Sequence, residues 1–276
     1  MLRWPFARVI RKTFQDGERY IRIVTPVRGR HVILVQSGQY SAQEHLVELL
    51  LLADAATREG ATTLTAILPF YPYRRAERRV LRGEAISAAV VARMLERAGI
   101  RRVIAVDLHE PSIANFFRIP VVNLFPFDLY TRALRRLGLR DAVVIGADGS
   151  VSMHAQQLAE RLGTMSTAFH KERRAHDRVH RVRLARPFTG RDVVLVDDEV
   201  NTGGTIAACT GELRRQGARS VTVVAAHGVF SGDGYTRLRR AGVRRVLVTD
   251  TIPQRRRMGL TVLSVASLIA EALRSR

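Results

Sequence analysis

Short apolar runs alternate with longer amphipathic segments along most of this chain, and this alternation restricts the fold more than any other feature of the sequence. The first cycle reads as a strand, a helix and a strand over residues 31–37, 41–60 and 62–70. The apolar runs are continuous, which is typical of strands covered on both faces of a parallel sheet. The sequence therefore predicts an α/β protein.

The alternation starts afresh after residue 138, with the apolar run DAVVIGA at 141–147. Two series of this kind indicate two α/β domains, 1–138 and 139–276, each a mainly parallel sheet flanked by helices. Ligands of open parallel sheets bind at the carboxyl ends of the strands. We therefore expect function in the polar clusters that follow the strands.

The chain carries a formal net charge of +20, nearly all of it from arginine, because lysine occurs only at Lys12 and Lys171. Such a charge predicts attraction to polyanions or to phosphorylated small molecules. The arginines are spread along the chain in short pairs, and aromatic residues make up only 6%. Modules dedicated to nucleic acid concentrate basic and aromatic residues on one element. Nucleic acid is therefore not expected as a partner.

Cysteine usage and apolar content bear on the location of the protein. Cys209 is the single cysteine, so an internal disulfide is impossible, and the first residues lack the sustained apolar run of a secretory signal. The richest apolar stretch, at 46–56, is interrupted by Glu48 and Asp54 and is too short to span a bilayer. We expect a cytoplasmic protein without a membrane-spanning segment.

The stretch VVLVDDEVNTGGT at 193–205 joins a buried strand to a helix through two carboxylates and a glycine pair. Glycines permit positive φ, and free N–H groups at a helix start attract an anion. Asp197 and Asp198 can accept hydrogen bonds from a diol such as ribose. The stretch thus fits a sugar phosphate, and on its own it equally fits a capped strand–turn–helix junction.

Further charged side chains follow other strands. In VDLHEPS, Asp107 and His109 share a face, and together with Asp148 they offer ligands for a hard cation such as Mg²⁺. The loops YPYRRAERR at 71–79 and HKERR at 170–174 offer positive charge for phosphates. Taken singly, these stretches are also explained by a hydrogen-bonded histidine and by solvated basic loops.

Together these stretches resemble the ribose-phosphate pyrophosphokinase family, also called phosphoribosyl pyrophosphate synthetases, over nearly the whole chain. The matching segments follow the family's order at close to its spacing: FQDGE (14–18), PVRGR (26–30), LPFYPYRRAERR (68–79), VDLHEPSIANFF (106–117), HKERR (170–174), VDDEVNTGGT (196–205), HGVFSG (227–232) and DTIP (250–253).

The resemblance implies two phosphoribosyltransferase-like domains and a ribose-phosphate diphosphokinase, a transferase of nucleotide biosynthesis. The implied reaction moves the diphosphoryl group of ATP to ribose 5-phosphate, with Mg²⁺, and yields phosphoribosyl pyrophosphate and AMP. It also implies a homo-oligomer built from dimers, with a hexamer as one form, in which a neighbouring subunit completes the ATP site.

The resemblance assigns roles to particular residues. The implied ATP-binding positions are Phe14, Asp16, Glu18, Arg75, Glu77 and Arg78. The implied metal positions are His109 and Asp148, with Asp107 as a nearby candidate. The implied catalytic pair is Lys171 and Arg173. The implied ribose 5-phosphate positions are Asp197, Asp198, Asn201, Thr202, Gly203, Gly204 and Thr205.

The chain departs from the family pattern at several of these positions. Asn201 stands where the family has a third acidic residue, the loop at 147–151 lacks the usual glycine pair, and Ala76 replaces a glutamine. These changes favour an alternative, a catalytically weak paralogue that binds nucleotide or sugar phosphate and regulates a true synthetase. A third hypothesis is a protein of the same fold that binds nucleic acid through its arginine surface. The retained Lys171 favours the active enzyme.

Overall fold

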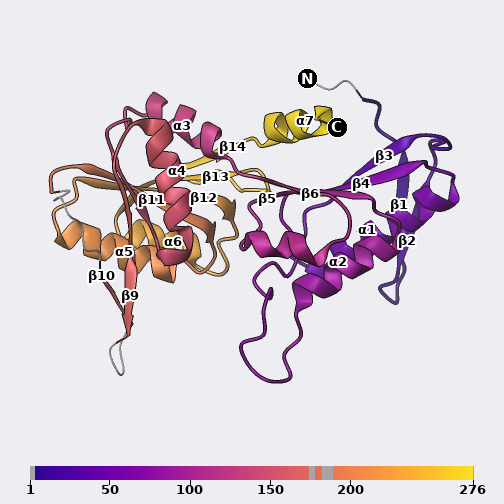
Figure 1. Ribbon diagram of the computed structural model, residues 1–276, viewed down its shortest axis with the longest axis horizontal. Coiled ribbons are helices and arrows are strands. Elements are labelled where there is room, and N and C mark those ends of the chain that lie inside the picture. Colours follow the sequence, from indigo (N-terminus) through magenta and orange to yellow (C-terminus); the bar gives the residue numbers. More distant parts are fainter. Residues whose placement is uncertain (1–3, 174–177, 182–188, 276) are drawn as a thin grey trace. The chain divides into compact units, whose positions relative to one another are not determined.

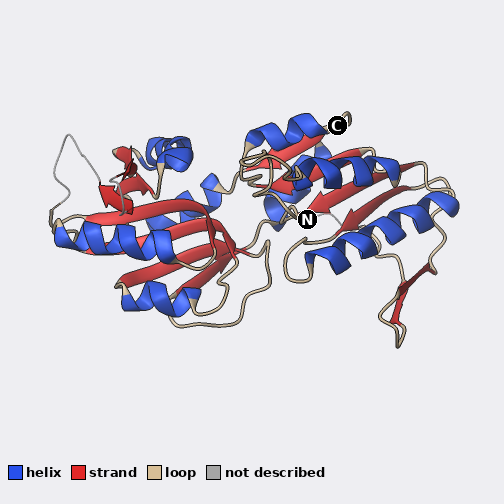
Figure 2. Cartoon of the chain, turned by 90° about the horizontal axis from the view of Figure 1, so that it is seen from below, coloured by secondary structure: helices blue, strands red, loops and turns tan. Residues whose placement is uncertain are grey.

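The structure, a computed structural model, describes residues 4–173, 178–181 and 189–275 and divides into two compact units. Unit 1 contains the residues up to Phe125 together with those from Ala266 onward, and unit 2 runs from Pro126 to Val265. Both units are α/β, with helices beside the strands of a parallel sheet (Figures 1 and 2). The predicted fold class is confirmed.

The sheet of unit 1 has four parallel strands in the order β3-β4-β5-β6. Its elements are β1 (Val9–Thr13), β2 (Arg19–Ile23), β3 (His31–Val35), α1 (Ala42–Arg58), β4 (Thr63–Leu68), α2 (Ser87–Arg97), β5 (Arg102–Val106), the 3-10 helix η1 (Pro111–Phe116), β6 (Val121–Leu124) and α7 (Ala266–Arg274). The strands β1 and β2 form a separate antiparallel hairpin.

Alternate residues of the strands in unit 1 enter two apolar clusters, one on each face of the sheet. Leu64, Ala66 and Leu68 of β4 pack with α1 and α2, whereas Ile67 between them packs with Ala272 of α7. Side chains of a strand alternate between the two faces, so α7 covers the face opposite α1 and α2.

The sheet of unit 2 has six parallel strands in the order β14-β13-β12-β11-β7-β8. Its elements are α3 (Phe127–Arg136), β7 (Val143–Gly146), η2 (Gly149–Val151), α4 (Ser152–Leu162), β8 (Ser166–Ala168), β9 (His170–Arg173), β10 (Arg178–Arg181), β11 (Asp192–Val200), α5 (Gly204–Arg215), β12 (Ser220–Gly228), α6 (Gly234–Arg240), β13 (Val243–Thr249) and β14 (Leu260–Leu263). The strands β9 and β10 form an antiparallel hairpin.

The core of unit 2 lies between the middle strands and the helices α5 and α6. Leu195 and Val223 from the sheet meet Leu213 of α5 and Leu238 of α6, and all four side chains are fully buried. The alternating neighbours in the strands, such as Val194, are equally buried. Burial on both faces accounts for the continuous apolar runs in the sequence.

The division between the units differs from the predicted boundary near residue 138 in two places. Helix α3 belongs to unit 2 because it packs on α4. Asp128 of α3 accepts a hydrogen bond from Nε of Arg161 in α4 over 3.2 Å. Helix α7 belongs to unit 1, where Arg102 donates to the carbonyl of Ala272 over 2.9 Å. Among the described residues, no helix is both long enough and apolar enough to cross a lipid bilayer.

Candidate active site

Two adjacent carboxylates lie at the carboxyl end of β11, in the middle of the sheet of unit 2. Asp197 stands opposite Ala225 of β12 in the strand register. Asp198 is buried, and its backbone N–H donates to Oδ1 of Asp197 over 2.9 Å. The strand β11 continues to Val200, so the pair lies within its last four residues and not after it as the sequence suggested. This is the carboxyl half of the strand, toward the edge where ligands of parallel sheets bind.

A third carboxylate, Asp148, acts on the same pair from the loop after β7. Burial raises the pKa of Asp197 well above its ordinary value, and the negative charges of Asp198 and Asp148 raise it further. The Asp148 side chain caps η2 by accepting from the backbone N–H of Ser150 over 2.9 Å. The three carboxylates therefore repel one another, and a bound cation or a hydroxyl donor would stabilise them.

The loop from Asn201 to Gly204 is fixed by close backbone contacts. Gly203 has φ of +72°, and a Cβ at this position would lie 2.7 Å from the carbonyl oxygen of Gly234. A Cβ at Gly234 would lie 2.4 Å from the carbonyl oxygen of Asn201. Only glycine tolerates these approaches, so the loop is held tightly against the start of α6.

This loop leads directly into α5, whose first turn presents backbone N–H groups without helical partners. Such a helix start favours an anion. The Oδ1 atom of Asn201 is buried and has no hydrogen-bond partner among the described residues. A buried acceptor of this kind fits a ligand that brings a hydroxyl or amine donor. The carboxylates, the amide oxygen and the helix start together suit a hydroxylated phosphate.

The raised pKa of Asp197 predicts a stability effect of definite sign. The native state holds this proton more tightly than the unfolded chain does, so ionising Asp197 above its ordinary pKa near 3.8 destabilises the fold. We expect Asp197→Asn to raise the Tm at neutral pH by a few degrees, since Tm moves about 2–4 °C per kcal/mol in a domain of this size. The gain should shrink as the pH falls toward that ordinary value. Thermal unfolding between about pH 4 and 8 measures it.

Asp192 provides the matched control, because its pKa is lowered by its hydrogen bond to Arg219. This carboxylate stabilises the fold above its ordinary pKa, and that stability is lost as the pH falls. Asp192→Asn should therefore lower the Tm at neutral pH, with the opposite sign. A pH-independent difference for Asp197→Asn, or a lower Tm at neutral pH, would contradict the assignment.

The predicted catalytic pair lies on the β9–β10 hairpin of unit 2. Lys171 stands opposite His180 and Arg173 opposite Arg178 in its register. Buried Phe169 anchors the base of the hairpin, because its N–H donates to Gly146 O over 2.9 Å. The side chains of Lys171 and Arg173 lie outside the described part of the structure, so their catalytic role stays a prediction.

In unit 1, Asp107 and His109 follow β5 at the carboxyl edge of its sheet. Asp107 has φ of +47°, a conformation that is rare outside glycine, and it is 5% exposed. The backbone N–H of Leu108 donates to Oδ1 of Asn123 over 3.0 Å, which fixes the turn. Strained backbone at a strand end is typical of a functional position.

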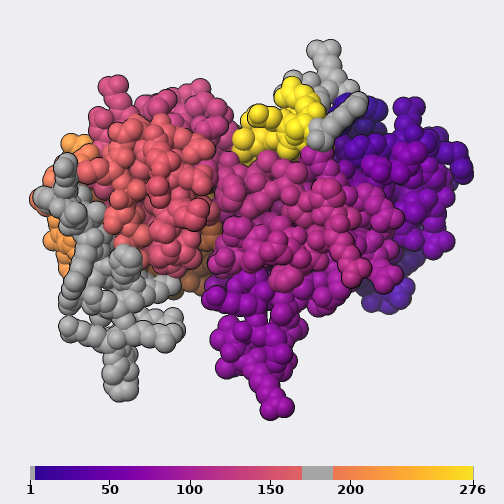
Figure 3. Space-filling model, in the orientation of Figure 1, coloured from indigo at the N-terminus to yellow at the C-terminus, as the bar shows by residue number. Residues whose placement is uncertain are grey.

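The long loop between β4 and α2 carries the predicted ATP-contacting residues of unit 1. Its tip, near residue 80, projects from the surface of this unit (Figure 3). Glu77 lies close to Arg78, with Oε1 and Nε 3.5 Å apart, and its buried Oε2 atom has no hydrogen-bond partner among the described residues. The structure places Arg75 in the same loop.

Arg74 differs from its neighbours in this loop, because it is only 1% exposed. Its guanidinium lies 5.1 Å from the centre of the Phe70 ring and donates to the carbonyl of Asp107 over 3.2 Å. Arg74 thus connects the loop to the strained turn after β5. The sequence grouped it with the exposed arginines, since a basic loop gives no sign of which side chain points inward.

The β1–β2 hairpin displays the other predicted ATP-binding residues in a single turn. Phe14 is 51% exposed and packs edge to face on Tyr20. The N–H of Phe14 donates to the carbonyl of Glu18 over 2.8 Å, and the N–H of Glu18 donates to Asp16 Oδ1 over 3.1 Å. The structure therefore brings Phe14, Asp16 and Glu18 together.

Sequence reasoning gave no role to His227, which is fully buried near the end of β12. Its Nδ1 lies 2.9 Å from Thr251 Oγ1, and its backbone pairs in register with Glu199 of β11. It therefore supports the strand end that carries the two aspartates. The segment HGVFSG at 227–232, which begins with this histidine, was the sequence signal that could have pointed to it.

The described residues contain no cluster of three or more His, Cys, Asp or Glu side chains suited to a metal ion. Asp107 and His109 lie in unit 1 and Asp148 lies in unit 2. Mg²⁺ is commonly held by one or two carboxylates together with substrate phosphates. Sparse carboxylates at strand ends therefore fit a metal that arrives with a phosphorylated substrate. The three metal positions stay predictions.

Comparison with known proteins decides the family. A model described as the N-terminal domain of ribose phosphate pyrophosphokinase matches residues 1–99, and one described as the phosphoribosyl synthetase-associated domain matches residues 180–276. A ribose-phosphate pyrophosphokinase of Synechococcus elongatus is 38% identical over 270 residues, which cover 96% of this chain and 82% of the relative. The chain belongs to the ribose-phosphate pyrophosphokinase family.

Other members of this family agree in sequence and fold. The ribose-phosphate pyrophosphokinase of Corynebacterium efficiens is 37% identical over 95% of this chain and 82% of the relative. The crystal structure of phosphoribosylpyrophosphate synthetase from Mycobacterium smegmatis matches with a TM-score of 0.91 and 36% identity, over 98% of this chain and 90% of that one. The predicted resemblance and the predicted enzyme class are confirmed.

Proposed function

We propose that this protein transfers the diphosphoryl group of ATP to the anomeric hydroxyl of ribose 5-phosphate and releases phosphoribosyl pyrophosphate and AMP. Its membership of the ribose-phosphate pyrophosphokinase family supports the reaction. The observation that carries the proposal is the pair Asp197 and Asp198 beside the helix start of α5. The carboxylates recognise sugar hydroxyls, and the N–H groups at the helix start recognise a phosphate.

The sugar phosphate is the proposed ligand of unit 2. Asp197 and Asp198 accept hydrogen bonds from the ribose hydroxyls. These bonds offset the burial and the repulsion from Asp198 that raise the pKa of Asp197. Thr202 and Thr205 supply hydroxyl groups to the 5-phosphate, and the backbone of Gly203 and Gly204 approaches it closely. Asn201 keeps a hydrogen-bonding side chain at the family's acidic position without the charge.

ATP is the proposed ligand of the residues of unit 1. Phe14 stacks on the adenine ring, while Asp16 and Glu18 accept from its polar edge. Arg75 and Arg78 bind phosphate oxygens, for which the guanidinium fork is well shaped. The proposed assembly is a homo-oligomer in which a neighbouring subunit completes this site. The proposed compartment is the cytoplasm.

Transfer forms a bond between the anomeric oxygen and the β-phosphorus of ATP and breaks the bond from that phosphorus to the oxygen bridging to the α-phosphate. The anomeric hydroxyl loses its proton, and AMP leaves with the bridging oxygen. Lys171 and Arg173 stabilise the negative charge that builds on these oxygens. Asp107 and His109 of unit 1 and Asp148 of unit 2 are the proposed candidates to hold Mg²⁺, which when bound would neutralise charge on the substrate phosphates.

A coupled assay with ATP, Mg²⁺ and ribose 5-phosphate tests the proposal by following AMP and phosphoribosyl pyrophosphate. Equal amounts of both products are expected. Saturable binding of ATP and ribose 5-phosphate without product would instead support the regulatory paralogue. Other pentose phosphates in the same assay establish which acceptor is preferred.

Asp198→Asn separates the two ligands of the proposal. Removing one carboxylate charge from the sugar site should weaken ribose 5-phosphate binding by about tenfold or more, since hydrogen bonds to charged groups contribute about 1.5–3 kcal/mol. ATP affinity should stay near that of the wild type, because the proposed ATP residues belong to unit 1. Calorimetry with each ligand measures both constants. Equal losses of affinity for ribose 5-phosphate and ATP would contradict the assignment of the sugar phosphate to unit 2 and of ATP to unit 1.

A further inference from the structure

A short sequence repeat in unit 2 is not used by the proposed reaction. The pattern Leu-Arg-Arg-x-Gly-x-Arg occurs at 134–140, 213–219 and 238–244. Each copy crosses the end of a helix, because α3 ends at Arg136, α5 at Arg215 and α6 at Arg240. The glycines of the three copies have φ of +73°, +87° and +91°, as in helices that end with a left-handed residue.

The topology brings the three copies to one edge of the sheet. Each copy leads into a strand, namely β7, β12 and β13, and Arg191 directly precedes β11. These strands are consecutive in the sheet, in the order β13-β12-β11-β7, and all of them are parallel. Neighbouring strands lie about 4.8 Å apart, so the strand starts form a row about 15 Å long at the amino edge.

This edge carries a large surplus of positive charge. We call its ten arginines the amino-edge arginines: Arg135, Arg136, Arg140, Arg191, Arg214, Arg215, Arg219, Arg239, Arg240 and Arg244. Asp141, Glu212 and Asp192 flank these segments, and they pair with Arg140, Arg215 and Arg219 in that order.

Three more of the amino-edge arginines, Arg135, Arg191 and Arg239, donate to backbone carbonyls, which leaves four. Within the described residues, no hydrogen bond or ion pair engages the side chain of Arg136, Arg214, Arg240 or Arg244. Arg244 acts on Asp192 through its charge alone, whereas Arg219 and Ser220 donate hydrogen bonds to this carboxylate. The four guanidinium groups are therefore available to an external anion.

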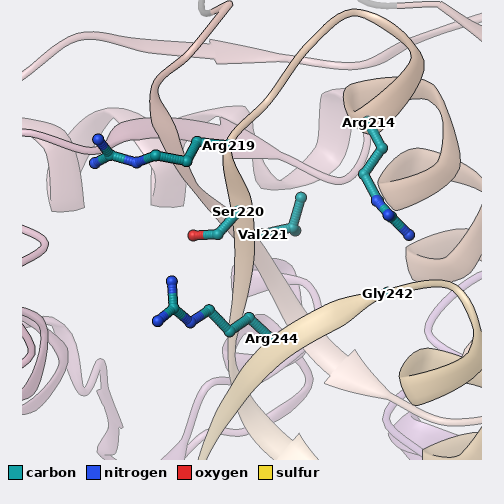
Figure 4. Close-up of a pocket in the computed structure, with 6 residues that line it drawn as sticks. All are labelled: Arg214, Arg219, Ser220, Val221, Gly242 and Arg244. Carbon is teal, nitrogen blue, oxygen red and sulfur yellow. The ribbon is translucent and has the colours of Figure 1, made fainter.

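Two neighbouring hollows lie between the turns of this edge. One has a volume of about 190 Å³ and is lined by Arg214, Arg219, Ser220, Val221, Gly242 and Arg244 (Figure 4). The other, of about 160 Å³, includes Arg191 and shares Arg219 with the first. The hollows follow the row of strand starts.

Arg214 extends from the end of α5 toward Gly242 in Figure 4. A Cβ on Gly242 would lie 2.2 Å from Arg214 Nη1, so the glycine lets this guanidinium lie directly against the backbone. The guanidinium of Arg214 therefore lies beside the turn that leads into β13.

We propose that the amino edge of unit 2 binds the phosphate backbone of nucleic acid without sequence preference. A row of cations a few ångström apart complements a polymer that carries a charge at similar intervals. Guanidinium groups bind phosphate oxygens in pairs of hydrogen bonds. The active-site carboxylates lie at the opposite, carboxyl edge of this sheet, so both edges can be occupied together.

The residue types at the edge favour nucleic acid over a membrane. The three repeats contain no aromatic residue, and Leu139 and Val243 within them are buried. Membrane-surface binding relies on apolar side chains that insert among the lipids. Contacts restricted to phosphates position a nucleic acid without reading its bases. The expectation against nucleic acid rested on arginines spread along the sequence and on the low aromatic content. The fold gathers the arginines, and contacts to phosphates alone need no aromatic side chain.

The test compares two variants of equal charge. The edge variant carries Arg136→Gln, Arg214→Gln, Arg240→Gln and Arg244→Gln. The control carries Arg22→Gln, Arg30→Gln, Arg93→Gln and Arg101→Gln, four exposed arginines of unit 1. Each removes four charges and takes the formal net charge from +20 to +16. Fluorescence anisotropy with two single-stranded RNAs of unrelated sequence measures Kd from about 50 to 200 mM salt.

The wild type should bind both RNAs with the same Kd and a steep salt dependence. The edge variant should lose at least about tenfold in affinity, and its slope of log K against log salt should be shallower by about 3, at roughly 0.7 for each phosphate that the protein no longer neutralises. The control should stay within about threefold of the wild type, because none of its four arginines belongs to the amino-edge arginines.

Several results would overturn the proposal: no RNA binding by the wild type, equal losses in the two variants, or binding to phosphatidylserine vesicles without binding to RNA. If the edge variant fails to fold, the pair Arg214→Gln and Arg244→Gln replaces it, and about half the change in slope is expected. The synthetase assay is run on the same samples, and both variants should retain activity. RNA binding and catalysis thus succeed or fail separately.

Discussion

Replacing Lys171 with alanine is expected to lower kcat by about 10²- to 10³-fold, the usual loss when one preorganised donor to transition-state charge is removed. The compact ammonium group is kept in a chain where every other basic residue except Lys12 is arginine. Diphosphoryl transfer spreads negative charge over oxygens that a positioned cation stabilises. ATP affinity and Tm should change little, because the core of unit 2 is built from the sheet, α5 and α6.

Lys12→Ala is the matched control, since it removes the only other lysine charge from an exposed position on β1. It should leave kcat near the wild-type value. Lys171→Arg should recover part of the rate, because it restores the charge but places it on a planar group. Wild-type turnover in Lys171→Ala would remove this residue from the mechanism, and equal losses in the two alanine variants would assign the effect to net charge.

The positions of several buried strands were readable from the sequence, because strands buried on both faces leave continuous apolar runs. Their order in the sheets was not. Leu195 and Val194 are both fully buried although they point to opposite faces of the sheet. The same logic put the carboxylates at 197 and 198 toward the carboxyl edge of the sheet, although it ended the strand too early, because β11 continues to Val200.

The partner of α7 was not readable in this way. An amphipathic helix fits any apolar sheet face, and only the structure shows that Ala272 packs on Ile67 and Ile104 of unit 1. The burial of Arg74 was hidden for a related reason. Its environment depends on Phe70 and on the turn at Asp107, and the latter is distant in the sequence.

The distribution of charge shows how sequence order and spatial order differ. Arginines at helix ends and strand starts recur at wide intervals along the chain and look dispersed. In a parallel α/β sheet, every such junction lies at the same edge, whereas the strand ends with their carboxylates lie at the other. Unit 2 therefore gathers arginines at one edge and places Asp197 and Asp198 toward the other, which the net charge of +20 does not reveal.

Gly203→Ala should cost about 10²-fold in kcat/KM for ribose 5-phosphate, the scale of loss from displacing a bound group by about 1 Å. The φ of +72° strains any other residue, and the new Cβ would lie 2.4 Å from Leu238 Cδ1 and 2.7 Å from the carbonyl oxygen of Gly234. The leucine side chain can move, but the backbone of Gly234 is itself packed against Asn201. The loop must therefore shift, and the N–H groups at the start of α5 shift with it.

Gly211→Ala, in the same helix, separates this effect from helix composition. Nothing lies within 4 Å of a Cβ added there, so alanine should be neutral or stabilising by up to about 1 kcal/mol. The Gly203 variant should lower the Tm as well, since strained φ values cost about 1–3 kcal/mol. Steady-state kinetics and thermal unfolding of both variants distinguish an effect on the phosphate site from an effect on folding alone. A lower Tm with unchanged KM for ribose 5-phosphate would make the glycine a folding requirement only, and it would remove the 201–205 loop from the proposed phosphate site.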